Sequence, residues 1–278
     1  MVSACSLVTA RQPMPGTGGW RWSVLARAEK LDDDRLVTYS QRLRTGRLQS
    51  GDHIDRNVYV QYERSTVQNP RNVVLTPADT GQGSAASFNY IWTGRYFNDL
   101  PYPTSGYGYG LELGGGITLA GDHKLFQRTV VRGIWLRPLS RGRLQLRGEL
   151  GAVLAQQDAA LPATQMFRTG GDTTVRGYKY LDIGVPLPGD LVGPGRLLTV
   201  ASVEWQRPIE RGGRPTGFEH TLFLDVGAVA DHVQELRPRA GLGTGVRWRS
   251  PVGPLDAAVA YGFHARKLRL HITAGFVF

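Results

Sequence analysis

The residues best suited to a specific interaction lie in the glycine-rich segment Met166–Tyr178, which reads M-F-R-T-G-G-D-T-T-V-R-G-Y. Gly170, Gly171 and Gly177 supply the positive φ angles that tight turns require. Between them stands Arg176, whose guanidinium can bind a carboxylate through two parallel hydrogen bonds. The segment therefore predicts a compact loop that docks elsewhere on the protein through its arginine.

Two carboxylates downstream are the expected partners of Arg176. Glu204 lies in A-S-V-E-W and Asp225 in F-L-D-V-G, each on the polar side of an alternating strand. The two strands follow one another, so the carboxylates can be neighbours across an antiparallel wall. The alternative is that all three are ordinary solvated charges, whose exposed pairs contribute only about 0–1 kcal/mol. Spacing alone leaves both interpretations open.

No arrangement typical of an enzyme accompanies this loop. The six histidines are scattered over different predicted strands and loops, without a pair at metal-ligand spacing. The segment Gly241–Gly245, G-L-G-T-G, resembles a phosphate-binding loop only faintly, because it opens no helix and lacks the following lysine. We therefore expect no catalytic residue, no metal site and no cofactor.

Composition narrows the class of protein further. No stretch of the 278 residues approaches 18 consecutive apolar residues, which excludes a transmembrane helix but not a β-barrel, whose signal is alternation. The net charge is +10, but the arginines are spread along strands rather than gathered in one patch, so we expect no nucleic-acid binding. A single cysteine, Cys5, excludes an intrachain disulfide.

Strand patterns fill the chain from Trp20 onward. The segment Tyr107–Leu119 alternates between apolar and small or polar residues, and Leu268–Phe278 alternates up to a terminal aromatic residue. A soluble β-sandwich also alternates, but its strands average about 5–6 residues, and charged residues well inside a strand are typical of a water-filled lumen. The expected strands are Trp20–Lys30, Arg35–Arg44, Ile54–Arg64, Ser84–Asn98, Tyr107–Gly121, Lys124–Leu139, Gly142–Gln157, Arg196–Ile209, Phe218–Asp231, Ala240–Ser250, Leu255–Phe263 and Leu268–Phe278.

These about 12 strands reach the ~9–11 residues that a tilted transmembrane strand needs. The sequence therefore predicts an all-β fold, an antiparallel transmembrane β-barrel over residues 20–278. Residues 1–19 carry no period and are predicted to be irregular, and an inward-folded lumenal loop is predicted over about 158–195.

The run Phe167–Tyr180, F-R-T-G-G-D-T-T-V-R-G-Y-K-Y, resembles the lumenal-loop motif of the BamA/TamA superfamily of outer-membrane assembly factors, in the form found in TamA. The resemblance continues through L-L-T-V-A-S-V-E-W, F-L-D-V-G and Gly243–Gly262 to the terminal strand. It is ordered over Phe167–Phe278 and weaker but continuous from about Trp20.

The resemblance implies a role for each matching residue. Arg176 would be the loop-tip arginine, with Asp225 as its principal acidic partner on the barrel wall and Glu204 as the second. Phe276 and Phe278 would belong to the terminal β-signal that is read during insertion of the protein itself. The lumenal-loop motif would comprise Gly170, Gly171, Asp172, Val175, Arg176, Gly177 and Tyr178.

The implied function is a non-enzymatic factor in the bacterial outer membrane, in contact with outer-membrane lipid. It would assist insertion or secretion of outer-membrane proteins such as autotransporters. Its partners would be a TamB-like periplasm-spanning protein and unfolded client proteins. Two alternatives remain open, a two-partner secretion transporter that passes an unfolded polypeptide and a plain porin-like barrel. An enzyme whose catalytic domain lies upstream is a further alternative.

The chain also departs from the superfamily pattern. Members have 16 strands and the motif loop precedes the last five, whereas only about seven predicted strands precede it here. We therefore expect roughly four strands and the periplasmic POTRA domains to be missing from this sequence. Members are thought to open sideways between their first and last strands, and only the last strand of that seam is expected here.

Overall fold

The protein is built almost entirely of β-strands. The computed structural model describes residues 2–10, 18–33, 36–68, 73–100, 102–121, 123–251 and 253–275. The strands of its main sheet are β1 (Val2–Ala10), β2 (Trp20–Asp32), β3 (Val37–Ser50), β4 (Ile54–Gln68), β5 (Gly83–Phe97), β6 (Gly106–Thr118), β7 (Leu125–Leu139), β8 (Gly142–Ala155), β11 (Leu197–Arg211), β12 (Arg214–Ala230), β13 (Arg239–Ser250), β14 (Gly253–Gly262) and β15 (Lys267–Ala274).

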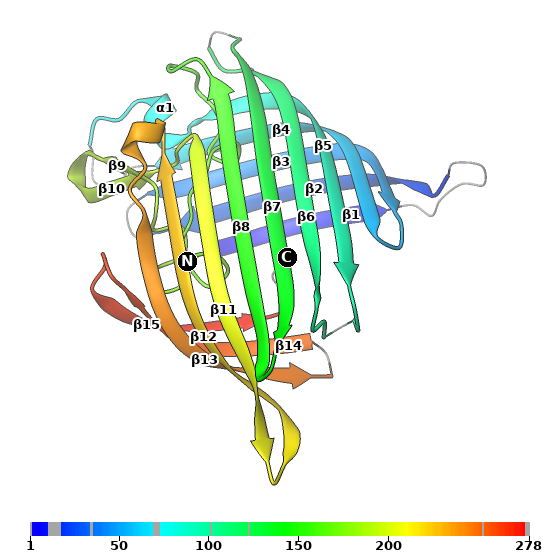
Figure 1. Cartoon of the computed structure of the whole chain (residues 1–278). Coiled ribbons are helices and arrows are strands. Elements are labelled where there is room, and N and C mark those ends of the chain that lie inside the picture. The colour runs from blue at the N-terminus through cyan, green and yellow to red at the C-terminus, as the bar shows by residue number, and fades with distance from the viewer. Residues whose placement is uncertain are drawn as a thin grey trace.

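These thirteen strands form one sheet in sequence order, and each pairs antiparallel with the next. The sheet curls around a lumen, so that β7, β8 and β11 form the near wall of Figure 1 while β1 and β15, from its two ends, both lie behind that wall. Within the described part of the chain, no ladder joins β1 to β15. The hairpin that joins β11 to β12 projects beyond its neighbours, because β8 pairs with β11 only as far as Gln206.

The predicted all-β barrel fold is confirmed, and the twelve expected strands correspond to β2–β8 and β11–β15. The prediction of an irregular segment over residues 1–19 is wrong for Val2–Ala10, which form β1. This strand pairs with β2 from Val2↔Leu31 to Ala10↔Ser23. The strand forms because its backbone pairs with β2, and a short segment without a hydrophobic period does not predict such a pairing from its own sequence.

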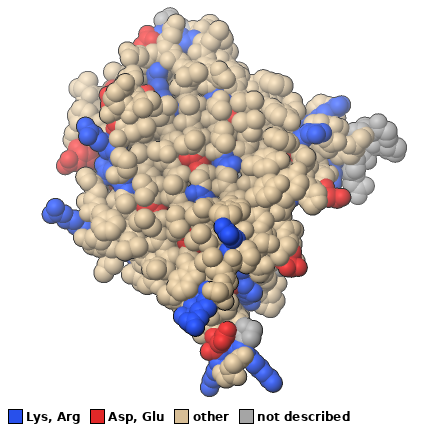
Figure 2. Space-filling view, viewed as in Figure 1, with Lys and Arg blue, Asp and Glu red and all other residues tan. Residues whose placement is uncertain are grey.

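The sheet has an apolar outer face and a polar inner face. On β15, Leu268, Leu270 and Ile272 point outward and are exposed, while His271 between them is buried. The face shown in Figure 2 is accordingly mostly uncharged, and charges of both signs cover the projecting β11–β12 hairpin at the bottom of that view. Strict alternation places charged side chains in the lumen, where the sequence predicts them. None of the helices in the described residues is long and apolar enough to cross a membrane.

The long connection between β8 and β11 folds into the lumen and carries a small core of its own. Its buried side chains Phe167, Val175 and Tyr178 pack with wall residues such as Val153 and Val200. The predicted lumenal loop over about 158–195 thus lies where the sequence places it. The connection also contains a short hairpin of β9 (Val185–Leu187) and β10 (Leu191–Gly193), joined by the 3-10 turn η1 (Pro188–Asp190). Two other short helices lie between strands of the main sheet, α1 (Pro77–Thr80) before β5 and η2 (Val233–Glu235) before β13.

Candidate functional site: the docked lumenal loop

The lumenal loop docks on the wall through Arg176, and Asp225 of β12 is the main partner. The Nε atom of Arg176 lies 2.7 Å from Oδ2 of Asp225, and Nη2 lies 3.0 Å from Oδ1. The backbone N–H of Arg176 donates to the same Oδ2 atom at 3.1 Å. Ser202 of β11 donates its hydroxyl to Oδ1 at 2.6 Å. The carboxylate of Asp225, which is fully buried, therefore has all its lone-pair directions engaged.

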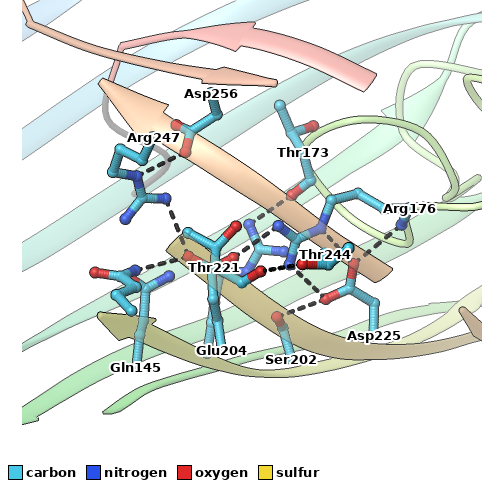
Figure 3. A network of polar contacts seen from close by, with 12 residues as sticks. Gln145, Thr173, Arg176, Ser202, Glu204, Thr221, Asp225, Thr244, Arg247 and Asp256 are labelled. Carbon is cyan, nitrogen blue, oxygen red and sulfur yellow. Dashed lines mark hydrogen bonds and ion pairs between the residues drawn. The ribbon is translucent and has the colours of Figure 1, made fainter. Parts of the chain in front are cut away.

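Glu204 of β11 is the second partner of the loop arginine. Nη1 of Arg176 donates to Oε2 of Glu204 at 2.7 Å, and the side chain of Glu204 is only 3% exposed. The two carboxylates lie on adjacent strands, because β11 and β12 pair with Ser202 opposite Asp225. The fork of the guanidinium thus spans both of them, as Figure 3 shows. A buried network of this kind fixes one position of the loop.

The network extends past the loop to β13 and β14. Arg247 donates to Oε1 of Glu204 at 3.0 Å and to Oδ1 of Asp256 at 2.6 Å. Gln206 donates its amide to the same Oε1 atom of Glu204 at 2.7 Å. Glu204 is therefore shared between the arginine of the loop and an arginine of the wall (Figure 3), so the docked loop is joined to four consecutive strands.

The electrostatics of the site keep Arg176 charged. Burial alone lowers the pKa of Arg176, but the hydrogen bonds and negative charges of Asp225 and Glu204 outweigh it and hold that pKa above its ordinary value. The guanidinium also lies over the ring of Phe223, 3.3 Å from its centroid. The aromatic face adds a cation–π contact on the side where no carboxylate reaches.

Glycines of the wall form the floor on which the loop backbone rests. A Cβ atom added to Gly241 of β13 would stand 1.9 Å from the carbonyl oxygen of Arg176. One added to Gly262 of β14 would stand 2.5 Å from the carbonyl oxygen of Gly177. One added to Gly227 of β12 would stand 2.6 Å from the side chain of Val175. Real Cβ atoms do not approach so closely, so the wall is glycine where the loop touches it.

The loop needs its own glycines as well. Gly170, Gly171 and Gly177 have φ angles of 108°, 104° and 96°, a region that L side chains rarely adopt. The turn is closed by a hydrogen bond from the N–H of Gly171 to the carbonyl oxygen of Val175 at 3.1 Å. The motif glycines thus act through conformation, whereas Arg176 acts through charge.

Two further motif residues reach the end of the sheet. Asp172 contacts Nδ1 of His271 on β15, and the N–H of Gly177 donates to Nε2 of the same imidazole at 2.8 Å. Because Nε2 accepts this bond, the proton of the neutral imidazole resides on Nδ1 and faces Asp172. The hydroxyl of Tyr178 donates to the carbonyl oxygen of Ala240 at 3.1 Å. The structure thereby brings the motif, Asp225 and Glu204 into one cluster.

The predicted terminal signal residues Phe276 and Phe278 lie outside the described residues.

Sequence reasoning missed several members of this cluster. Arg147 of β8 donates to the carbonyl oxygens of Thr173 and Thr174 at 2.5 and 3.2 Å. His271 and Gly241 were also without an assigned role, and Gly241 lies in the stretch that faintly resembles a phosphate loop. Alternation in the sequence is consistent with Arg147 and His271 on the lumenal face. Only the tertiary structure shows that they contact the loop.

The arrangement couples the loop to the wall through ion pairs, with a cavity at its side. Its carboxylates are engaged by arginines, and a cavity of about 460 Å³ lies beside it, lined in part by Arg143, Arg147, Arg247 and His271. Among the described residues, no three His, Cys, Asp or Glu side chains are grouped so that they could hold a metal ion.

Replacing His271 with phenylalanine should loosen the loop at its contact with β15. The variant leaves the buried N–H of Gly177 without an acceptor, which costs about 1–3 kcal/mol. The expected result is a lower urea midpoint of unfolding in detergent micelles. His232→Phe, at an exposed turn position before η2, is the matched control and should change the midpoint little. Equal midpoints for the His271 variant and the parent would exclude a stabilising role for this contact.

Comparison with known proteins identifies several similar chains. The outer membrane protein assembly factor BamA of Nitratidesulfovibrio vulgaris is 31% identical over 156 residues, which are 55% of this chain and 19% of that protein. BamA from Haemophilus ducreyi lacking POTRA domains 1–3 superposes with a TM-score of 0.72 at 17% identity, covering 98% of this chain and 60% of that one. CdiB from Acinetobacter baumannii gives a TM-score of 0.60 at 14% identity, covering 97% and 49%.

The chain thus spans about a fifth of the curated relative and about half to three fifths of the two solved structures. At these low identities, the two structures are similar to this chain in fold. The family assignment rests on a different comparison, in which the model of the Omp85 superfamily domain matches residues 19–278. That match covers the sheet from β2 onward and the whole lumenal loop. The chain belongs to the Omp85 superfamily.

Proposed function

We propose that this chain is the barrel of an outer-membrane protein assembly factor, seated in the bacterial outer membrane, that helps other outer-membrane proteins to insert. The observation that carries the proposal is the lumenal loop, docked by Arg176 on Asp225 and Glu204 inside an Omp85 barrel. These buried ion pairs hold the loop in one position against β11 and β12. A factor that positions its wall strands for a client would depend on such a fixed element.

The edge of β15 supplies a physical route for this activity. Within the described residues, β15 pairs only with β14 and ends the sheet. An unpaired strand edge offers a row of backbone donors and acceptors to an incoming strand. The contact of the loop with His271 holds β15 in place from inside. An unfolded client segment would therefore add to an edge whose position the loop has already fixed.

Within the superfamily we propose a TamA-type role, with autotransporters as clients and a TamB-like periplasm-spanning protein as partner. The support is the form of the run Phe167–Tyr180, which reads G-G-D-T-T-V-R-G-Y-K-Y from Gly170 to its end. The proposed role is non-enzymatic: the barrel binds and positions, and outer-membrane lipid surrounds its apolar outer face.

The experiment is a client-insertion assay with the chain refolded into lipid vesicles. The parent should speed folding of an autotransporter barrel, read as the heat-shifted band on a gel, relative to empty vesicles. Arg176→Ala should lose most of this acceleration, while Arg141→Ala, at an exposed turn arginine, should retain it. A folded parent that gives no acceleration would overturn the proposal.

Single-channel recording separates the two alternatives. A large, steady conductance in the parent without client folding would favour a porin-like barrel. A conductance that is blocked by an unfolded secreted polypeptide, again without client folding, would favour a two-partner secretion transporter.

A further inference from the structure

The lumenal loop is held at a second place, on another part of the wall. Nη2 of Arg168 lies 2.5 Å from Oδ2 of Asp33, which stands at the turn between β2 and β3. Both side chains are nearly buried, at 9% and 11% exposure. Asp33 is itself fixed, because its Oδ1 atom accepts a hydrogen bond from the N–H of Leu36 at 2.8 Å. This ion pair joins positions 135 residues apart in the sequence.

A second buried carboxylate in this part of the sheet also binds the loop. Gln165 donates its amide to Oε2 of Glu63 on β4 at 2.5 Å. Arg42 of β3 binds the other oxygen of Glu63, also at 2.5 Å. Arg128 of β7 donates to the carbonyl oxygen of Gln165 at 3.2 Å. The side chain of Glu63, which is only 1% exposed, therefore binds one residue of the wall and one residue of the loop. Glu204 does the same at the docking site of Arg176.

The two places lie in different parts of the sheet. The first docking site, Arg176 with Asp225 and Glu204, belongs to β11 and β12. The second docking site, Arg168 with Asp33 and Gln165 with Glu63, belongs to β4 and the turn between β2 and β3. Strands β5–β8 separate the two sites along the sheet. The short segment from Gln165 to Arg176 is therefore fastened at both ends to strands that do not pair with one another.

We propose that the lumenal loop is a strut between the two parts of the wall, and that Arg168 is its second anchoring arginine. Each anchor is a buried ion pair with little freedom to move, and Phe167 and Val175, buried between the anchors, keep the segment compact. Movement of the loop at Arg176 is then transmitted to the β2–β3 turn. The strut depends on contacts within the chain and holds whether or not the barrel assembles clients.

The distance between the two parts of the wall tests this proposal directly. Cys5, the one cysteine of the sequence, is exposed on β1 next to β2, and Leu270 points outward from β15. Spin labels on Cys5 and on a Leu270→Cys background report the distance between them in refolded protein. The parent should give one narrow distribution. Arg168→Ala should broaden it and shift its mean, although Arg176 and its carboxylates are untouched.

Two further variants keep the test decisive. Asp33→Asn removes the charge that binds Arg168 but keeps an oxygen for the N–H of Leu36, so the turn survives. It should broaden the distribution in the same direction, whereas Arg141→Ala, which removes a solvent-exposed arginine, should not. If Arg168→Ala does not give the heat-shifted folded form, the Asp33→Asn result decides alone. A parent-like distribution in the folded variants would overturn the strut.

Discussion

Replacing Arg176 with alanine is expected to lower the free energy of unfolding by about 3–5 kcal/mol, the cost of breaking a buried ion pair. The carboxylates of Asp225 and Glu204 stay in place at 0% and 3% exposure, and both lose a cationic partner. Arg247 still binds Glu204, but Asp225 keeps only neutral donors, the Ser202 hydroxyl and the backbone N–H of residue 176, so the larger share of the cost falls on Asp225. The measurement is the urea midpoint in micelles, followed by the gel heat shift.

The control separates the loss of this contact from the loss of any positive charge. Arg141→Ala removes an exposed arginine and leaves its backbone carbonyl, which accepts from the indole of Trp205, unchanged. Such surface changes fall within about 0.5 kcal/mol. Arg176→Lys should lie between the two, because a lysine keeps the charge but cannot span two carboxylates with a planar fork. If Arg176→Ala matched Arg141→Ala, the docked arginine would contribute nothing to stability.

The second large effect is expected from the wall side, in Gly241→Ala. The added methyl group would stand 1.9 Å from the carbonyl oxygen of Arg176, so the loop backbone has to move. Overpacking of this kind costs about 1–3 kcal/mol, and contact with backbone rather than a flexible side chain favours the upper end. The displaced loop should become sensitive to protease between β8 and β11. No residue of the loop itself is altered.

Gly115→Ala is the matched control for this variant. Gly115 lies within β6, and a Cβ atom there would meet no other atom within 4 Å. Its stability should equal or slightly exceed that of the parent. The double variant Gly241→Ala, Arg176→Ala should cost less than the sum of the two single changes, since both act on the same docked contact. Strict additivity would mean that Gly241 acts elsewhere.

Much of this fold could be predicted because successive residues of a strand point to opposite faces of the sheet, so alternation of apolar and polar residues shows which face each one occupies. Charged residues on the polar face and apolar residues on the other set the strands from β2 to β15 and the inward direction of Glu204 and Asp225. The glycine pattern and Arg176 marked the loop as a docking element. The lengths of β11 and β12 were harder to predict. The expected strands end at Ile209 and begin at Phe218, whereas β11 ends at Arg211 and β12 begins at Arg214, because their hairpin projects beyond the sheet.

The remaining parts of the site could not be predicted because they depend on which residues meet across the lumen. Arg168 and Asp33 are separated by 135 positions, and no local pattern links them. Gly241 sits in an ordinary alternating strand, where the absence of a side chain has no meaning until the carbonyl oxygen of Arg176 is placed above it. Even β1 forms through its ladder with β2 rather than through its own sequence.

The two docking sites also close segments of very different length. Arg176 lies 28 residues from Glu204 and 49 from Asp225, whereas Gln165 lies 102 residues from Glu63 and Arg168 lies 135 from Asp33. Because contacts that are close in sequence cost less loop-closure entropy, we expect the loop and the last five strands to assemble first on refolding and β2–β4 to join the strut late. A substitution at Arg168 should therefore speed unfolding and leave the refolding rate nearly unchanged, while one at Arg176 slows refolding.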